Sequence, residues 1–355
     1  MQTLSYFLGS NSSMGFFSLF NELYNPDDNW NMYIIKGGPG TGKSSLMKKV
    51  AAEAENRKLR TERIYCSSDP LSLDAVIIPE IKTSIADGTK PHTIEPIYPG
   101  IVEHIINLGE YWEYTKLFNN KDKIKDATKL NSSYHKKCIK YLNACAIIEN
   151  EINTEVEKCF LKEKADRFIL RYCEKLALTD TDSAITQNRF LSAITHKGIT
   201  VNYSSLFDTC KDILIIKDKN IFISNYILRK IAKTTDDAGI DKTVCLCPLN
   251  PERIEHIIFP NIGKAIFTSN SYHPAISNKY KTIRSERFLD KDKYNNIKNK
   301  LTFLNKAKME LIGESVQCLD NAKITHDILE SYYISAMNFK KLNELGDKLI
   351  NEIFQ

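Results

Sequence analysis

Residues 37–44 have the types and the spacing that chemistry on a nucleoside triphosphate requires. The segment is GGPGTGKS and fits the pattern G-x-x-x-x-G-K-[ST] of a phosphate-binding loop. Glycines allow positive φ, which turns successive backbone N–H groups toward phosphate oxygens. The N-terminus of a following helix adds partial positive charge. The segment therefore predicts nucleotide binding, and the alternative is a glycine-rich turn that holds no ligand.

Two side chains of this segment have specific expected roles. Lys43 is expected to reach the β- and γ-phosphates and to act in catalysis, and the Ser44 hydroxyl is expected to ligate Mg²⁺. The expected cofactors are therefore ATP and Mg²⁺. The residues expected to surround the nucleotide are Gly37, Gly38, Pro39, Gly40, Thr41, Gly42, Lys43, Ser44 and Ser45.

The elements that position this loop can also be predicted. Residues 33–35 are Tyr-Ile-Ile and predict a short buried strand, and residues 45–52 have the apolar spacing of an amphipathic helix. A phosphate-binding loop also needs an acid at the tip of a neighbouring strand. Asp87 closes the apolar run 83–87 before Gly88 and is the expected Mg²⁺ ligand. The alternative for Asp87 is that it only caps the turn.

Two further acids are weaker candidates for catalysis. Asp69 follows the expected strand 63–67 and is placed as an acceptor base, or as the N-cap of the segment that follows it. Glu80 follows an apolar run and is placed to position water, or is a solvated acid at the end of that run.

The chain contains an internal repeat. Residues 34–51 are IIKGGPGTGKSSLMKKVA and residues 215–232 are IIKDKNIFISNYILRKIA, aligned without a gap at an offset of 181 residues. The offset continues downstream and aligns Cys66 with Cys247 and His92 with His273. Because both histidines are retained although only one loop is intact, we expect them to have a shared packing role. The repeat predicts two copies of one domain.

The second copy has lost the phosphate-binding residues. Asp218 replaces Gly37, and Ser224 replaces Lys43. Ile221 and Ile223 replace glycines, and β-branched residues do not easily adopt positive φ. The acid at position 218 would also repel phosphate. We expect the fold of this copy to persist without nucleotide, and the alternative is that the altered loop binds another ligand.

These motifs together resemble an uncharacterised bacterial family of two-repeat P-loop ATPases. The resemblance is carried by GGPGTGKSSLMKK, by YCSSDPLSLDAVIIPE and by IADGTKPH, and it covers most of both halves. It implies ATP binding and hydrolysis. The chain departs from the family at residues 218–225, where a second intact loop is expected, and this departure argues against a mechanism with two nucleotides.

The expected fold class is α/β, with two P-loop domains that each contain an open parallel sheet flanked by helices. The domains are expected at residues 1–180 and 181–355, with a polar join at 179–188. Residues 103–178 and 283–354 are rich in Lys, Glu, Asn and Leu, and each segment predicts a long helical hairpin. Their charged faces are expected to be solvated, or to bind a protein partner.

Composition excludes several classes of function. The net charge of +5 is spread over 355 residues with no basic run, so nothing indicates nucleic-acid binding. No apolar stretch approaches the length of a membrane span, and no signal peptide is expected. The nine cysteines are scattered, which is typical of reduced thiols in a cytoplasm.

Three functions remain open from the sequence. The first is an ATPase with an active first copy and a second copy that regulates or completes the site, with Arg189 or Arg229 as the donated cation. The second is a small-molecule or nucleotide kinase, and the third is a nucleotide-gated binding module with negligible turnover. A kinase lid would carry arginines, and residues 103–165 contain none, which favours the ATPase.

Overall fold

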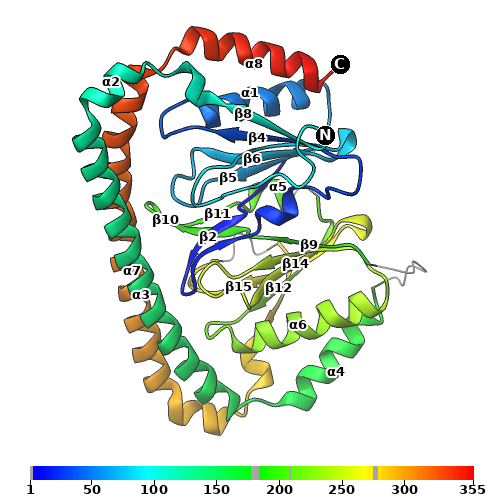
Figure 1. Cartoon of the computed structure of the whole chain (residues 1–355). Coiled ribbons are helices and arrows are strands. Elements are labelled where there is room, and N and C mark those ends of the chain that lie inside the picture. Colours follow the sequence, from blue (N-terminus) through cyan, green and yellow to red (C-terminus); the bar gives the residue numbers. More distant parts are fainter. Residues whose placement is uncertain (1–2, 177–183, 208, 275–278) are drawn as a thin grey trace.

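Two six-stranded mixed sheets with the same strand order form the centre of the molecule (Figure 1). The computed structural model describes residues 3–176, 184–207, 209–274 and 279–355. The expected join at residues 179–188 therefore lies partly outside the described residues. The first sheet has the order β1 (Thr3–Tyr6), β5 (Thr61–Tyr65), β6 (Leu73–Ile78), β7 (Thr83–Asp87), β4 (Asn31–Lys36) and β8 (Glu103–Asn107).

The second sheet repeats the first strand by strand. Strands β12, β13, β14 and β15 align with β4, β5, β6 and β7 at the offset of 181 residues found in the sequence. The identical order is consistent with duplication of one unit. From one edge to the other the strands are β9 (Thr186–Arg189), β13 (Lys242–Leu246), β14 (Ile254–Phe259), β15 (Lys264–Ser269), β12 (Asp212–Lys217) and β16 (Lys281–Arg284).

The expectation of parallel sheets is wrong for one strand in each repeat. Strand β6 pairs antiparallel with both β5 and β7, and β14 does the same with β13 and β15. A parallel pair needs a crossover of about a dozen residues or more. Residues 66–72 and 79–82, which connect β6 to its neighbours, are too few for such a crossover. The remaining pairs within each sheet are parallel.

The two sheets face each other across a shared hydrophobic core. Met32 and Ile34 from β4, and Ile213 and Ile215 from β12, belong to one buried cluster. Phe7 and Phe190, which are equivalent in the two repeats, exchange two N–H···O bonds of 2.9 Å. This reciprocal pair is the pattern of an internal two-fold dimer. Beside it lie two hairpins, β2–β3 (Gly9–Ser12, Gly15–Ser18) and β10–β11 (Ser192–Thr195, Gly198–Val201).

The two longest helices pair with each other and not with their own neighbours in sequence. Helix α3 (Lys121–Glu157) runs antiparallel to α7 (Lys291–Ala336) along one side of both sheets (Figure 1). Asn131 donates to the carbonyl of Ala322 near one end, and Lys300 pairs with Glu151 near the other. The expected helical hairpins within residues 103–178 and 283–354 are therefore corrected, because each long helix finds its partner in the other repeat.

The short helices that follow are exchanged between the repeats. Helix α1 (Lys43–Asn56) covers the outer face of the first sheet, and α8 (Phe339–Ile353) from the second repeat packs on it. Helix α6 (Phe222–Asp237) covers the outer face of the second sheet, and α4 (Lys162–Cys173) from the first repeat packs on it. Figure 1 shows both exchanged helices. The remaining helices are α2 (Tyr114–Asn119) and α5 (Ser204–Phe207).

The exchanged helix α8 completes the core of the first repeat. Leu342, Leu349 and Phe354 are buried in one cluster with Leu46 and Met47 of α1. A fragment that ends at residue 180 would leave this apolar face of α1 in water. None of the described helices is long and apolar enough to cross a membrane.

We expect Leu342→Ala to lower the free energy of unfolding by about 2–5 kcal/mol, because it removes buried methyl groups and leaves a cavity. Leu342 is 7% exposed. The matched control is Leu170→Ala on the other exchanged helix, where the side chain is 62% exposed and the change should stay within about 0.5 kcal/mol. Urea denaturation followed by circular dichroism measures both, and equal losses would contradict the exchange.

Candidate functional site

The loop between β4 and α1 contains two residues with positive φ and leads directly into the N-terminus of a helix. Gly40 and Gly42 have φ of 67° and 86°, in the left-handed region that favours glycine. Within the described residues, the backbone N–H groups of Gly42, Lys43 and Ser44 have no hydrogen-bond partner. Unpaired N–H donors at a helix N-terminus are the groups that bind phosphate in known loops of this kind.

The Lys43 side chain is held inside this loop. Its ammonium donates to the carbonyls of Gly37 at 3.0 Å and Gly38 at 2.7 Å. It also lies 3.4 Å from Asp87 Oδ2, and the two side chains are only 11% and 15% exposed. The structure thus brings together two of the expected site residues, from the loop after β4 and from the end of the neighbouring strand β7.

Asp87 and Ser44 are oriented by local contacts. The other oxygen of Asp87 accepts from the backbone N–H of Thr89 at 2.9 Å and from its hydroxyl at 2.5 Å. Asp87 therefore has both the turn-capping contacts and the position beside Lys43. Ser44 Oγ accepts from the N–H of Leu73 at 2.9 Å, which fixes the hydroxyl at the start of β6. The hydroxyl keeps a second lone pair for a ligand.

The sequence analysis did not predict a buried pair near the loop, formed by His92 and Asp74. His92 Nε2 lies 3.1 Å from Asp74 Oδ2, and Phe20 stacks on the imidazole at 4.3 Å. Burial alone lowers the pKa of His92, but the charge of Asp74 and its hydrogen bond outweigh this, so that the pKa is raised above its ordinary value. The charges of Asp87 and Lys43 also act on the pKa of His92. The repeat held a signal for this pair, because position 74 aligns with Glu255.

Glu80 is not at the site, and its expected role in positioning water is corrected. Because β6 is antiparallel, its last residue Ile78 pairs with Thr83, the first residue of β7. Glu80 follows at that end, in a short 3₁₀ turn, and accepts from the N–H of Arg60 at 2.5 Å. It therefore lies at the edge of the sheet opposite to Asp87.

Asp69 has structural partners in its own loop. Its carboxylate accepts from the N–H of Leu71 and from the hydroxyl of Ser72, both at 3.1 Å. These bonds form a turn before strand β6. Asp69 is therefore not the N-cap of a helix, which was the alternative expected from the sequence. Lys323 of α7 lies 3.8 Å from the same carboxylate. Lys323 is therefore a cation that the second repeat brings to the loops of the first.

The two arginines expected to donate a cation are placed elsewhere. Arg189 is 2% exposed and pairs with Glu62 at 3.1 Å and Glu22 at 3.8 Å, where the two repeats meet. Arg229 is exposed on α6, the helix that covers the second sheet. Neither residue is positioned to reach the loop of the first repeat, and that expectation is wrong for both.

The second repeat nevertheless packs directly on the loop. A Cβ atom at Gly38 would lie 2.7 Å from Tyr333 Cε1, and one at Gly42 would lie 2.6 Å from Leu342 Cδ2. A side chain at Gly38 would crowd Tyr333 of α7. A side chain at Gly42 would crowd Leu342 of α8 and would also meet the positive φ that favours glycine.

In the second repeat an internal carboxyl group accepts hydrogen bonds from the N–H groups of the equivalent loop. Asp218, at the position of Gly37, is buried and accepts from the N–H of Ser224 at 2.7 Å and of Asn220 at 3.2 Å. Burial raises the pKa of Asp218, although the N–H of Ser224 opposes the shift. Ile221 keeps a φ of 69°, close to that of Gly40, so the expectation that isoleucine would avoid this conformation is corrected there.

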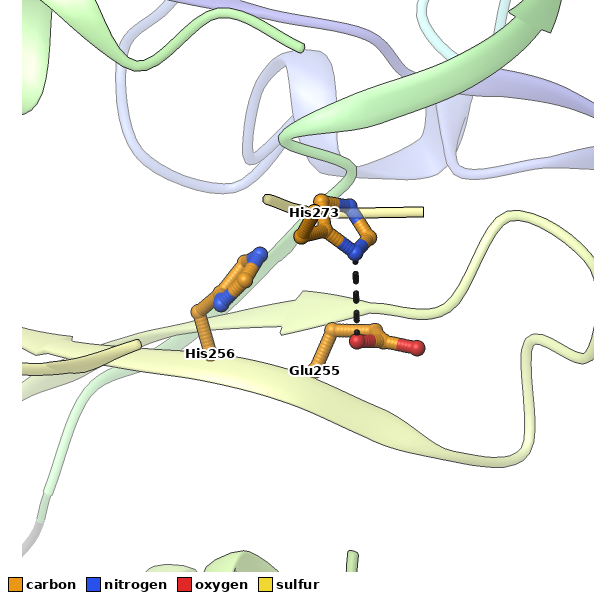
Figure 2. Close-up of side chains that lie close together, drawn as sticks. All are labelled: Glu255, His256 and His273. Carbon is orange, nitrogen blue, oxygen red and sulfur yellow. Dashed lines mark ion pairs between the residues drawn. The ribbon is translucent and has the colours of Figure 1, made fainter. Parts of the chain in front are cut away.

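Figure 2 shows the counterpart of the buried histidine pair. His273 Nδ1 lies 3.4 Å from Glu255 Oε2, and its Nε2 is 2.7 Å from Ser192 Oγ. His273 and Glu255 are almost completely buried, and Asp74 and His92 in the first repeat are buried as well. The charge of His273 keeps the pKa of Glu255 below its usual range, although burial alone would raise it. The packing role expected for the two histidines agrees with this geometry.

The same cluster does not fit a metal ion. Glu255, His256 and His273 offer ligand atoms within 4.8 Å of one another. However, His256 Nδ1 accepts from the N–H of Thr268 at 3.1 Å, so the neutral ring carries its proton on Nε2 and has no lone pair left for a metal. Burial also lowers the pKa of His256 and keeps the ring neutral. Two ligands remain, fewer than a structural zinc site needs.

Comparisons with family models, with curated proteins and with solved structures find no match to this chain.

The raised pKa of His92 predicts a pH dependence of stability. A histidine whose pKa is higher in the folded state stabilises the fold below about pH 6.5, and this contribution is lost as the pH rises through the folded-state pKa. We expect the free energy of unfolding of the wild type to fall from pH 6 to pH 8 more steeply than that of Asp74→Asn. The His273–Glu255 pair is common to both proteins and cancels. Parallel pH profiles would show that the His92–Asp74 pair contributes nothing.

Proposed function

We propose that this protein binds ATP and hydrolyses it with Mg²⁺ at the loop of the first repeat. The observation that carries the proposal is the contrast between two loops on the same scaffold. The N–H of Lys43 is unpaired within the described residues, whereas the equivalent N–H of Ser224 is taken by Asp218. The first loop has unpaired N–H donors and a lysine at position 43, which is the arrangement that binds a triphosphate, and the second loop has Ser224 at the equivalent position.

Each residue of the first loop has a task in this proposal. The backbone N–H groups hold phosphate oxygens, and Lys43 exchanges its bonds to the Gly37 and Gly38 carbonyls for bonds to the β- and γ-phosphates. Ser44 and Asp87 supply oxygen ligands, which Mg²⁺ prefers. The ion would neutralise charge on the phosphates. We assign no residue to the positioning of water, since Glu80 is at the opposite edge of the sheet.

The structure gives the kinase alternative less support than the ATPase. An acceptor base needs a free carboxylate, and both oxygens of Asp69 are engaged in its own turn and beside Lys323. A kinase lid must also open and close over the substrate, and α3, the helix expected to serve as one, is paired along its length with α7. These contacts favour hydrolysis over transfer to a small molecule.

The second repeat is proposed to complete or regulate the site through α7 and α8. Tyr333 and Leu342 contact the loop where glycines allow it, and Lys323 approaches Asp69. A change in the conformation of the loop on nucleotide binding would alter its contacts with α7 and α8. A protein partner that binds the charged surface of α3 and α7 would sense the same change.

We expect Lys43→Ala to lower the rate of phosphate release from ATP by about 10²-fold or more, because a preorganised charge at the transferring phosphoryl group is lost. The matched control is Ser224→Ala at the equivalent position of the second repeat, where turnover should stay within about twofold. A colorimetric phosphate assay measures both, with circular dichroism to confirm folding. Hydrolysis at the wild-type rate by Lys43→Ala would refute the proposed site.

A further inference from the structure

A cavity of about 810 Å³ lies in the second repeat beside the degenerate loop. It is formed at the carboxyl ends of β12, β15 and β16 and is bounded by the first part of α7. This edge of an α/β sheet is where ligands bind in many folds. The volume is in the range of small-molecule sites.

The walls of this cavity carry an excess of positive charge. Lys217, Lys219, Arg284 and Lys298 line it, and within the described residues none of the four makes an ion pair. In the first repeat, Lys36, the counterpart of Lys217, donates to the carbonyls of residues 88 and 94. Within the described part of the chain, Lys217 has no such partner, whereas Lys36 is held by the segment that follows β7.

The two acids of the lining do not balance this charge. Asp218 directs its oxygens at the N–H groups of its own loop. Glu286 is the second acid, against four cations. Tyr294, Leu301 and Met309 of α7 add an apolar wall. An anion with an apolar body therefore matches this lining better than a cation or a neutral polar molecule.

We propose that this cavity binds a small phosphomonoester with an apolar or aromatic body. A dianionic phosphate suits a guanidinium fork with mobile ammonium groups around it. A triphosphate does not suit the site, because Asp218 already takes the N–H donor of Ser224, and Ser224 carries no charge at the position equivalent to Lys43. The site is separate from the proposed ATP site and does not depend on hydrolysis there.

The test uses the full chain with Lys43→Ala, so that binding at the first loop does not contribute. Titration calorimetry is carried out with AMP, GMP, CMP, UMP and phenyl phosphate. We expect at least one of these to bind with a stoichiometry near one. Adenosine and benzoate are the controls that lack the phosphate, and neither should displace the bound probe.

Arg284→Ala in the same background should weaken binding by about tenfold or more, because a charge-assisted contact is lost. Arg287→Ala is the matched control, an exposed arginine three residues away that does not line the cavity. If Arg284→Ala does not fold by circular dichroism, Lys298→Ala on the exposed surface of α7 replaces it. Absence of binding by all five probes, or binding that neither Arg284→Ala nor Lys298→Ala weakens, would overturn the proposal.

Discussion

The packing of α8 on α1 is the contact on which the rest of the structure depends. Helix α1 begins at Lys43, and its apolar face is covered by Leu342 and Leu349 from the other repeat. An amphipathic helix must bury that face, and here the partner comes from the last residues of the chain. The loop before α1 is therefore held from both sides, by its own sheet and by the exchanged helix. Neither repeat can complete its core alone, so the two copies fold as one unit.

Comparison of the two loops separates the features that the fold fixes from the donor groups that differ between the repeats. Gly40 and Ile221 have nearly the same positive φ, although a β-branched residue in this region stores roughly 1–3 kcal/mol of strain. The turn therefore persists after the glycine is lost, because the strand and the helix on either side fix it. What differs is the set of donors: the first loop has unpaired N–H groups and a lysine, and the second has an internal carboxyl group on its own N–H.

Sequence patterns predicted β4, the loop, α1 and the strand that ends at Asp87, because local periodicity and a specific motif define them. They could not give the direction of β6, since a fully buried apolar run is the same in both directions. Because β6 is antiparallel, Glu80 lies at the sheet edge far from the loop. Asp74, which the sequence did not indicate, lies at the edge near the loop. The sequence also could not predict the packing partner of α3, because an amphipathic pattern identifies a buried face but not the element that covers it.

We propose that one of the two loops, the first, binds a triphosphate. Titration calorimetry of the wild-type chain with a non-hydrolysable ATP analogue and Mg²⁺ measures how many such sites the chain has. We expect a stoichiometry near one per chain, and we expect Lys43→Ala to abolish this binding. A stoichiometry near two would mean that the loop containing Asp218 also accepts a triphosphate, and the absence of binding would mean that the glycines of the first loop serve only the close packing of α7 and α8. Either result would contradict a single triphosphate site at the first loop.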